Sequence, residues 1–379
     1  YVTNSGHNEV AVINAATRKV IGDIPTGWYP TQVLAHDGKL SITSAKGLGA
    51  GPNNGPGHPN PTDPRDTAEN QYSGSMIKGL LSTVSEPDAA TLAKLTATVE
   101  KNNTANDPAR SSAVPNQIGT TSSKIKHVIY IVRENRTFDQ ELGSNGRGNA
   151  DPSLNLFGEE SAPNTRALAR QFTTFDNFYA DAEVSANGWN WVSQANSNPW
   201  SEEMWPSNYS GRGAPYPAES NDPDSRAKEH DSYFWEHLSK NNISFRNYGF
   251  YTTLDKKGKA HGVDKKILDP NTDHDFIGWS LDCPDSARSF APMAKNCGPK
   301  SRVDEWKSDF NKQLAKGSVP TVQLVRFGND HTQATKVGVP TPQAYVADND
   351  QAIGQLVETV SHSPIWKDTA IFLTEDDAQ

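Results

Sequence analysis

The feature that most constrains the fold is a set of three short, nearly continuous apolar runs, each ending abruptly in polar and charged residues. The runs are IKHVIYIV (125–132), TVQLVRF (321–327) and TAIFLT (369–374). Such runs are typical of strands that are buried on both faces of a parallel sheet. Apolar residues at helical spacing lie before the second run, at Val303, Trp306, Phe310 and Leu314. Others lie between the second and third runs, at Ala352, Ile353, Leu356, Val357 and Val360. Strands alternating with helices predict an α/β sheet with helices on both faces.

The residues that follow these runs are candidates for a binding site. In open α/β sheets, ligands bind in the crevice outside the carboxyl ends of the strands, so side chains far apart in the sequence meet there. Carboxylate and amide oxygens together with imidazole suit a divalent cation. The alternative is that these residues simply lie in solvated loops. The residues concerned are Glu134, Asn135, Asn329, Asp330, His331, Asp376 and Asp377.

The first 50 residues have a different pattern, of short strand-like runs separated by Asn, Gly and Pro. The runs are YVTN (1–4), VAVIN (10–14), KVIGDIPTG (19–27) and KLSIT (39–43). Together with TGWYPTQV (26–33) they resemble the YVTN type of β-propeller repeat. One blade cannot close a propeller, so residues 1–50 are expected to be the terminal blade of a longer array. A small strand cap on the main domain is the alternative.

Residues 51–123 are predicted to be a linker that contains one helix. The stretch 47–75 is rich in Gly and Pro, which do not sustain regular structure. A helix is expected after Pro87 and Asp88, because Leu92, Leu95 and Val99 share one helical face. The α/β domain is then expected over residues 124–379.

Composition and cysteine content narrow the function classes. The formal net charge is −9 and no Lys/Arg-rich block is present, which argues against nucleic-acid binding. No run reaches the ~18 apolar residues of a membrane-spanning helix. Cys283 and Cys297 lie close together without a CxxC spacing, so a local disulfide in an exported protein is favoured over two free thiols.

Several stretches together resemble one enzyme family. They include HVIYIVRENRTFDQELG (127–143), ALARQFTTFDNFYADAEVSANGWNW (167–191), FGNDHT (327–332) and SPIWKDTAIFLTEDDAQ (363–379). The sequence is similar, over roughly residues 76–379, to the phosphoesterase family that contains bacterial phospholipases C and an acid phosphatase, within the alkaline phosphatase superfamily. The resemblance implies an alkaline-phosphatase-like α/β core, a divalent metal ion (Ca, Mg, Mn or Zn) and a small-molecule or lipid phosphate ester as substrate. It also implies a secreted, periplasmic or cell-surface location, and it gives no indication of oligomeric state.

The resemblance assigns roles to individual residues. Glu134 and Asn135 match metal ligands that follow the first strand, and Asp376 and Asp377 match the paired acids that complete the metal site. Ser185, in EVSANG, matches a nucleophilic hydroxyl that attacks phosphorus and forms a phospho-enzyme. His331 matches a histidine that faces the metal or the phosphate and that stabilises charge or protonates the leaving oxygen.

Each assignment has a structural alternative. Glu134 could pair only with Arg133 or Arg136. Asn135 could cap a helix that begins near Thr137, since Asn is a good N-cap. Ser185 could be only a turn former, in which case Thr137 is the rival hydroxyl.

Two departures from the family pattern bear on function. Trp189 stands where many relatives carry a histidine, which puts the substrate class in question. The chain stops at Gln379, where relatives continue with a further His- and Asp-containing motif, so we expect a domain truncated at its carboxyl end.

The alternatives to a phosphoesterase are a non-catalytic binding or scaffold protein and a sulfatase. A sulfatase needs a C/S-x-P-x-R sequence, and Cys283 is followed by Pro-Asp-Ser-Ala, which lacks it. His274, in DHD (273–275), is a metal-ligand type of residue, but it lies in a polar stretch with no strand before it and is left out of the predicted site.

Overall fold

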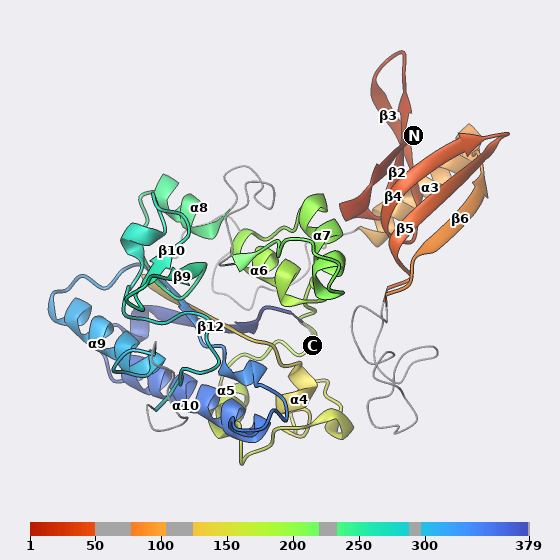
Figure 1. The fold of residues 1–379 in the computed structure, drawn as a ribbon. Helices are drawn as coiled ribbons and strands as arrows, with labels where there is room; N and C mark the ends of the chain where they lie inside the picture. The colour runs from red at the N-terminus through yellow and green to blue at the C-terminus, as the bar shows by residue number, and fades with distance from the viewer. Residues whose placement is uncertain (50–76, 104–123, 220–232, 288–296, 378–379) are drawn as a thin grey trace. The chain divides into compact units, whose positions relative to one another are not determined.

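The computed structural model describes residues 1–49, 77–103, 124–219, 233–287 and 297–377 (Figure 1). The chain divides into two compact units, Tyr1–Ser112 and Ala113–Gln379. No helix within the described residues is long and apolar enough to span a membrane.

The described residues of the first unit form two antiparallel sheets and a helix. One sheet has the order β1 (Val2–Asn4), β2 (Glu9–Asn14), β3 (Lys19–Pro25), with the short helix η1 (Ser5–His7) between its first two strands. The other has the order β4 (Trp28–His36), β5 (Lys39–Gly47), β6 (Leu80–Ser85). The helix is α3 (Ala89–Asn102).

Helix α3 covers the apolar side chains of this unit. Its N-cap, Asp88, accepts a 2.7 Å hydrogen bond from Thr91 N. Leu92 packs into a core with Val10, Ile24, Leu40 and Ile42. The helix lies so close to β3 that a Cβ on Gly22 would come within 2.6 Å of Leu92 Cγ. Glycine is therefore required in the middle of β3.

The expected β-rich character of the first 50 residues is confirmed, but the strands do not form one four-stranded blade. The described strands pair within two separate three-stranded sheets. Strand β4 was not predicted, because Pro30 interrupts its pairing with β5. Strand β6 lies in the stretch that was predicted to be a linker.

The second unit is built on a four-stranded parallel sheet. Its order is β12 (Thr369–Glu375), β7 (His127–Arg133), β11 (Val322–Arg326), β8 (Phe245–Tyr248), and all neighbouring strands are parallel. The three predicted strands are confirmed. Only β11 is buried throughout, whereas β12 is an edge strand and is half-buried. The prediction that β12 is buried on both faces is therefore wrong.

Helices cover both faces of the sheet, as predicted. Ile129, Ile131 and Val325 pack against α9 (Arg302–Ala315) and α10 (Pro342–Ser361) on one face, where α5 (Pro163–Gln171) also contributes. Val128, Tyr130 and Val132 alternate with them and face the other side, toward α6 (Ser185–Gln194) and α8 (Phe234–Lys240). The period-two alternation along β7 thus separates two cores.

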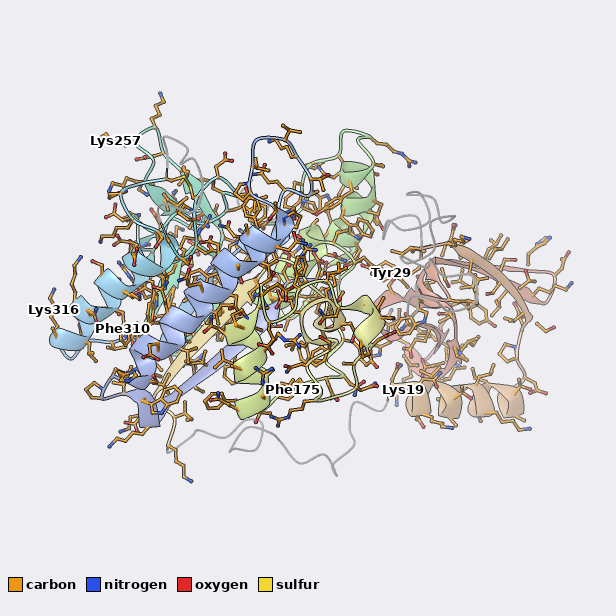
Figure 2. All side chains as sticks on the ribbon, turned by 90° about the horizontal axis from the view of Figure 1, so that it is seen from below. Lys19, Tyr29, Phe175, Lys257, Phe310 and Lys316 are labelled. Atoms are coloured by element: carbon orange, nitrogen blue, oxygen red, sulfur yellow. A yellow bond between two sulfur atoms is a disulfide. The ribbon has the colours of Figure 1, made fainter. Side chains whose placement is uncertain are left out.

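Side chains along α9 show how the helix meets the core. Phe310 is fully buried and stacks on Trp306, with ring centroids 4.8 Å apart. Lys316, just beyond the carboxyl end of the helix, projects outward (Figure 2). The remaining short elements of the unit are α4 (Phe138–Leu142), η2 (Pro152–Leu154), α7 (Pro199–Tyr209), β9 (Thr252–Leu254), β10 (Ala260–Gly262), η4 (Asp269–Asn271), η5 (Asn329–His331) and η6 (Trp366–Asp368).

The two cysteines form the local disulfide that was favoured from the sequence. Cys283 is bonded to Cys297, 14 residues further along the chain. Both are buried and pack with Ile277. The bond closes a loop within the segment before α9. A 3.0 Å hydrogen bond from Asn329 to the carbonyl oxygen of Cys283 joins this segment to the region after β11.

Candidate functional site

Polar residues that follow β7 and β11 line a cavity of about 240 Å³, together with the first residue of α6. Glu134 follows β7, His331 ends η5 after β11, and Ser185 is the first residue of α6. The cavity is lined by Glu134, Ser185, Tyr209, Tyr216, Glu219, Trp279 and His331.

Asp377 links the predicted nucleophile to the predicted metal ligands. Ser185 Oγ donates a 2.8 Å hydrogen bond to Asp377 Oδ2. Asn135 Nδ2 lies 3.1 Å from both carboxylate oxygens of Asp377. Three residues that lie 50, 192 and 242 positions apart in the chain therefore form one hydrogen-bonded group. Asn135 and Asp377 are two of the residues that the strand-end rule was expected to gather.

The start of α6 lies directly against the end of β12. A Cβ on Gly188 would be 2.3 Å from the carbonyl oxygen of Asp376 and 3.2 Å from Asp377 Cβ. Only a glycine allows this approach. The position of Ser185 beside Asp377 thus depends on Gly188, one helical turn further on.

Glu134 is held by groups that the sequence analysis did not identify. It accepts a 2.7 Å hydrogen bond from the indole nitrogen of Trp189 and forms a salt bridge with Arg326. The Arg326 guanidinium also lies 2.5 Å from Glu219 and stacks between Trp189 and Trp279, at 4.2 and 4.7 Å from their ring centroids. The indole of Trp189 is therefore a hydrogen-bond donor to Glu134.

The arginines on either side of Glu134 have other partners. Arg133 pairs with Glu141 and with Glu375, at 2.5 and 3.1 Å. Arg136 donates to the carbonyl oxygens of Asp330 and His331, both at 2.7 Å. The alternative that Glu134 pairs only with these arginines is wrong. They instead tie β7 to the ends of β12 and β11.

The helix-cap alternatives are also settled by the geometry. Thr137, not Asn135, is the N-cap of α4, and its hydroxyl accepts from Gln140 N at 3.3 Å. The Thr137 hydroxyl is thus engaged in capping. Ser185 opens a ten-residue helix rather than a turn.

Asp376 is the most unusual residue of the site. It is 2% exposed, and within the part of the chain that the structure describes neither of its carboxylate oxygens has a hydrogen-bond partner; among the same residues the carbonyl oxygen of the Asn135 side chain lacks one too. A buried carboxylate without partners is costly unless a cation or a proton compensates its charge. Burial, and then the charges of Asp377 and Glu134, raise the pKa of Asp376 well above its usual range.

The other acids of the site show the same excess of negative charge. Burial raises the pKa of Glu134 to about 8, although Arg326 acts in the opposite direction. Burial also raises the pKa of Asp377. A divalent cation would reverse these effects by favouring the charged carboxylates. The free oxygens of Asp376 and Asn135 fit such an ion, because oxygen ligands suit Ca²⁺, Mg²⁺ and Mn²⁺.

The acids are more widely spaced than in a closed metal shell. Within the described ranges, two groups of three residues have ligand atoms that all lie within 4.8 Å of one another: His261/Asp269/His274 and Asp273/Asp275/Glu305. Glu134, Asp376 and Asp377 do not form such a group. An ion bound between Glu134, Asp376 and Asp377 would therefore draw these carboxylates closer together than they are.

His331 reaches the same cavity with one nitrogen already committed. Its Nδ1 lies 2.8 Å from the carbonyl oxygen of Thr332 and so must donate a proton to it. The ring rests edge-on against Trp279, with centroids 5.1 Å apart. Nε2 is therefore the nitrogen that is available to a ligand.

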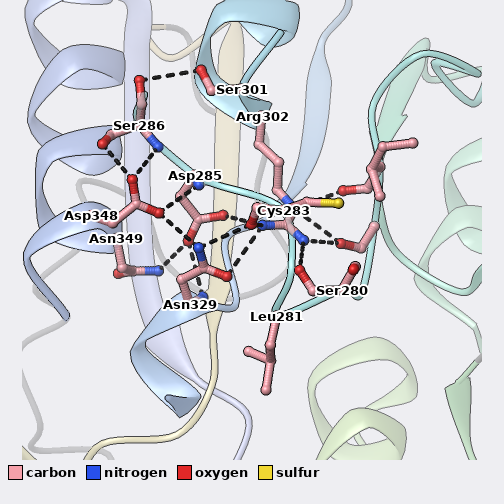
Figure 3. Close-up of polar contacts among 12 residues, drawn as sticks. Ser280, Leu281, Cys283, Asp285, Ser286, Ser301, Arg302, Asn329, Asp348 and Asn349 are labelled. Atoms are coloured by element: carbon pink, nitrogen blue, oxygen red, sulfur yellow. Dashed lines mark hydrogen bonds and ion pairs between the residues drawn. The ribbon is translucent and has the colours of Figure 1, made fainter. Parts of the chain in front are cut away.

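A second buried polar cluster, centred on Arg302, holds the backbone of η5 in place (Figure 3). Arg302 donates to Asp285 and to the carbonyl oxygens of Gly278, Ser280 and Cys283, and Asp285 accepts from Asn329 N at 3.0 Å. Asp348, on α10, accepts from Asn329 Nδ2 at 2.7 Å. This cluster fixes the backbone that carries Asp330 and His331.

The sequence analysis missed four lining residues, Tyr209, Tyr216, Glu219 and Trp279, and it also missed Arg326, which pairs with Glu134. Arg326 carried a signal, because a charged residue inside an otherwise apolar strand needs a buried partner. Tyr216, Glu219 and Trp279 lie in irregular segments, where no periodicity marks an inward-facing side chain. Tyr216 donates a 2.9 Å hydrogen bond to Glu219, which in turn pairs with Arg326.

The chain is similar to a known family and to a solved structure. A comparison with curated proteins finds no match. One similar solved structure is that of a protein in the alkaline phosphatase superfamily from Vibrio parahaemolyticus, with 17% identity and a TM-score of 0.42. The match covers 68% of this chain and 56% of that chain, so this chain spans little more than half of the Vibrio protein's length. The model of the phosphoesterase family matches residues 144–379, which include Ser185, His331, Asp376 and Asp377. The chain belongs to the phosphoesterase family.

Proposed function

We propose that the second unit hydrolyses phosphate esters with a divalent metal ion, through a phosphorylated Ser185. The observation that carries the proposal is the Ser185 hydroxyl, 2.8 Å from Asp377, at a cavity beside the unpartnered carboxylate of Asp376. A nucleophile, an acceptor for its proton and a place for a cation therefore lie in one group. Membership of the phosphoesterase family supports the same reaction class.

The residues that would hold the metal are Asp376, Asp377, Asn135 and Glu134. When bound, the ion supplies positive charge that stabilises the attacking oxygen and the phosphoryl group. Arg326 and Trp189 hold Glu134 in position through the salt bridge and the 2.7 Å hydrogen bond. They exclude water from that side of the carboxylate.

Ser185 and His331 divide the proton transfers. Ser185 Oγ passes its proton to Asp377 and forms a bond to phosphorus, while the bond from phosphorus to the leaving oxygen breaks. His331, when protonated, gives a proton to that oxygen from Nε2. Water then cleaves the bond between Ser185 and phosphorus and releases phosphate or a phosphomonoester.

The disulfide between Cys283 and Cys297 supports an exported protein, because disulfides persist in oxidising compartments. We propose a secreted, periplasmic or cell-surface location on this basis. For the first unit we propose the end of a YVTN-type propeller, supported by its antiparallel strands.

Hydrolysis of p-nitrophenyl phosphate, bis-p-nitrophenyl phosphate and p-nitrophenylphosphorylcholine, with and without chelator, tests the reaction. We expect chelator-sensitive turnover of at least one of them.

Ser185→Ala should lower kcat by at least about 1,000-fold, whereas Ser318→Ala, at an exposed serine after α9, should leave it unchanged. Mass spectrometry of the quenched wild-type protein should find one phosphoryl group on Ser185. Equal rates in Ser185→Ala and the wild type would contradict the proposal, and absence of turnover with every cation supplied would favour a binding role.

A further inference from the structure

Outside the proposed active site, three side chains converge on the β9–β10 hairpin. His261 lies on β10, Asp269 begins η4, and His274 follows three residues after η4. One nitrogen of each histidine and one carboxylate oxygen of Asp269 all lie within 4.8 Å of one another. We propose that His261, Asp269 and His274 bind a zinc ion, at a site separate from the catalytic one.

The backbone around these residues holds them close together. Gly262 N donates a 2.8 Å hydrogen bond to Asp269 Oδ1. A Cβ on Gly262 would lie 2.7 Å from Asp269 N, so only glycine lets η4 pack this closely on β10. Leu268 is fully buried and anchors the start of η4 in the core. The position of Asp269 is thus fixed by the fold and not by a flexible loop.

The two histidines approach Asp269 from adjacent segments. His261 Nδ1 is 3.3 Å and His274 Nδ1 is 4.0 Å from Asp269 Oδ1, and the two rings are 4.6 Å apart. Ala260 N donates a 2.9 Å hydrogen bond to the carbonyl oxygen of His274, which pairs the two segments. Ligands about 2 Å from a tetrahedral zinc ion lie roughly 3.3 Å apart, so small side-chain rotations close the three onto one ion.

Each histidine has an outer hydrogen-bonding partner of the kind that metal-bound histidines use. His261 Nε2 lies 3.5 Å from Asp255 Oδ2, which leaves Nδ1 for the ion. His274 Nδ1 donates a 2.6 Å hydrogen bond to the Ala260 carbonyl oxygen, which leaves Nε2 of the half-exposed ring for the ion.

The ligand types indicate zinc or a similar transition-metal ion. Two imidazoles and one carboxylate suit Zn²⁺, whereas oxygen-only sets suit Ca²⁺ and Mg²⁺. The nearest cation, Lys265 Nζ, is 3.7 Å from Asp269 Oδ2 and is largely exposed, so it can move away. No thiolate competes, because the chain's two cysteines are bonded to each other.

A neighbouring group of acidic residues is a weaker candidate for a metal site. Asp273, Asp275 and Glu305 also lie within reach of one ion. Each of them already has a cationic partner: Arg246 at 3.2 Å, Lys259, and Lys300 at 2.8 Å, respectively. Their charge is therefore compensated without a metal.

Zinc binding to the whole chelator-treated chain tests the site, with zinc chloride as the probe and bound metal counted by elemental analysis after dialysis. We expect His274→Ala and Asp269→Asn each to lower zinc affinity at this site by at least tenfold and to remove one zinc per chain. His362→Ala, at an exposed histidine after α10, should bind zinc as the wild type does. Cobalt should give a visible absorption band in the wild type that both variants lack.

Asp376→Asn separates this site from the proposed active site. If the zinc and the cobalt band persist in Asp376→Asn and vanish in His274→Ala, the two sites are distinct and the proposal stands whether or not the chain hydrolyses esters. Unchanged zinc content and affinity in both His274→Ala and Asp269→Asn would overturn it. So would a cobalt band that is lost only in Asp376→Asn.

Discussion

Two buried polar clusters lie side by side at the carboxyl ends of the strands, and they differ in how their carboxylates are satisfied. In the Arg302 cluster, both oxygens of Asp285 and both oxygens of Asp348 accept hydrogen bonds (Figure 3). In the proposed active site, neither oxygen of Asp376 accepts a hydrogen bond from any described residue. The first cluster is complete as it stands and stabilises the fold. We expect the second to be stabilised by the cation proposed above.

Removing the centre of the satisfied cluster should have the largest effect on stability. Arg302→Met leaves the buried Asp285 carboxylate without its charged partner and several carbonyl oxygens without a donor. We expect a loss of ~3–5 kcal/mol in the free energy of unfolding, measured by urea denaturation. Arg212→Met, at an exposed arginine, should change it by less than about 0.5 kcal/mol. Similar small changes in both variants would show that the Arg302 cluster does not stabilise the fold.

The close approach of α6 to β12 should give the next largest effect. Gly188→Ala places a Cβ 2.3 Å from the carbonyl oxygen of Asp376, so the strand end or the helix must shift. We expect a loss of ~1–3 kcal/mol in stability together with reduced turnover. Gly6→Ala, where a Cβ meets nothing within 4 Å, is the control. Wild-type stability and rate in Gly188→Ala would mean that the Ser185–Asp377 geometry does not depend on this contact.

A matched pair of tryptophans distinguishes positioning from packing. Trp189 Nε1 donates to Glu134 at 2.7 Å and Trp306 Nε1 donates to Gln323 at 2.8 Å, and both side chains are fully buried. Replacement of either by Phe should cost ~1–2 kcal/mol in stability. Only Trp189→Phe should also weaken catalytic metal binding, by roughly tenfold, as measured by activity against metal concentration. Equal metal dependence in the two variants would remove Trp189 as a positioning residue.

The sequence predicted the parts of the fold whose pattern is local. Apolar runs identified β7, β11 and β12, and the strand-end rule grouped Glu134, Asn135, Asp376 and Asp377. Strand β8 was missed because it carries Arg246 and Asn247, polar residues whose partners include the distant Asp309 and Thr272.

The rest of the site could not be predicted because it depends on tertiary contacts. Arg326 stacks between Trp189 and Trp279, which lie 90 residues apart in the chain. Glu219 comes from a segment without periodicity. His274 was set aside because no strand precedes it, yet the structure places it beside His261 through the pairing of Ala260 with its backbone.

The central claim, that the Asp376 cluster is completed by a divalent cation, is tested most directly by one measurement. It is the rise in melting temperature when Ca²⁺, Mg²⁺, Mn²⁺ or Zn²⁺ is added to the chelator-treated chain, in a His274→Ala background that removes the proposed zinc site. At least one ion should raise the melting temperature of the parent, because ligands that bind only the folded state stabilise it. That rise should disappear in Asp376→Asn and persist in Asp348→Asn. Without metal, we expect Asp348→Asn to have the lower melting temperature of the two variants. An equal rise in the parent and in Asp376→Asn, or no rise with any ion, would contradict the account.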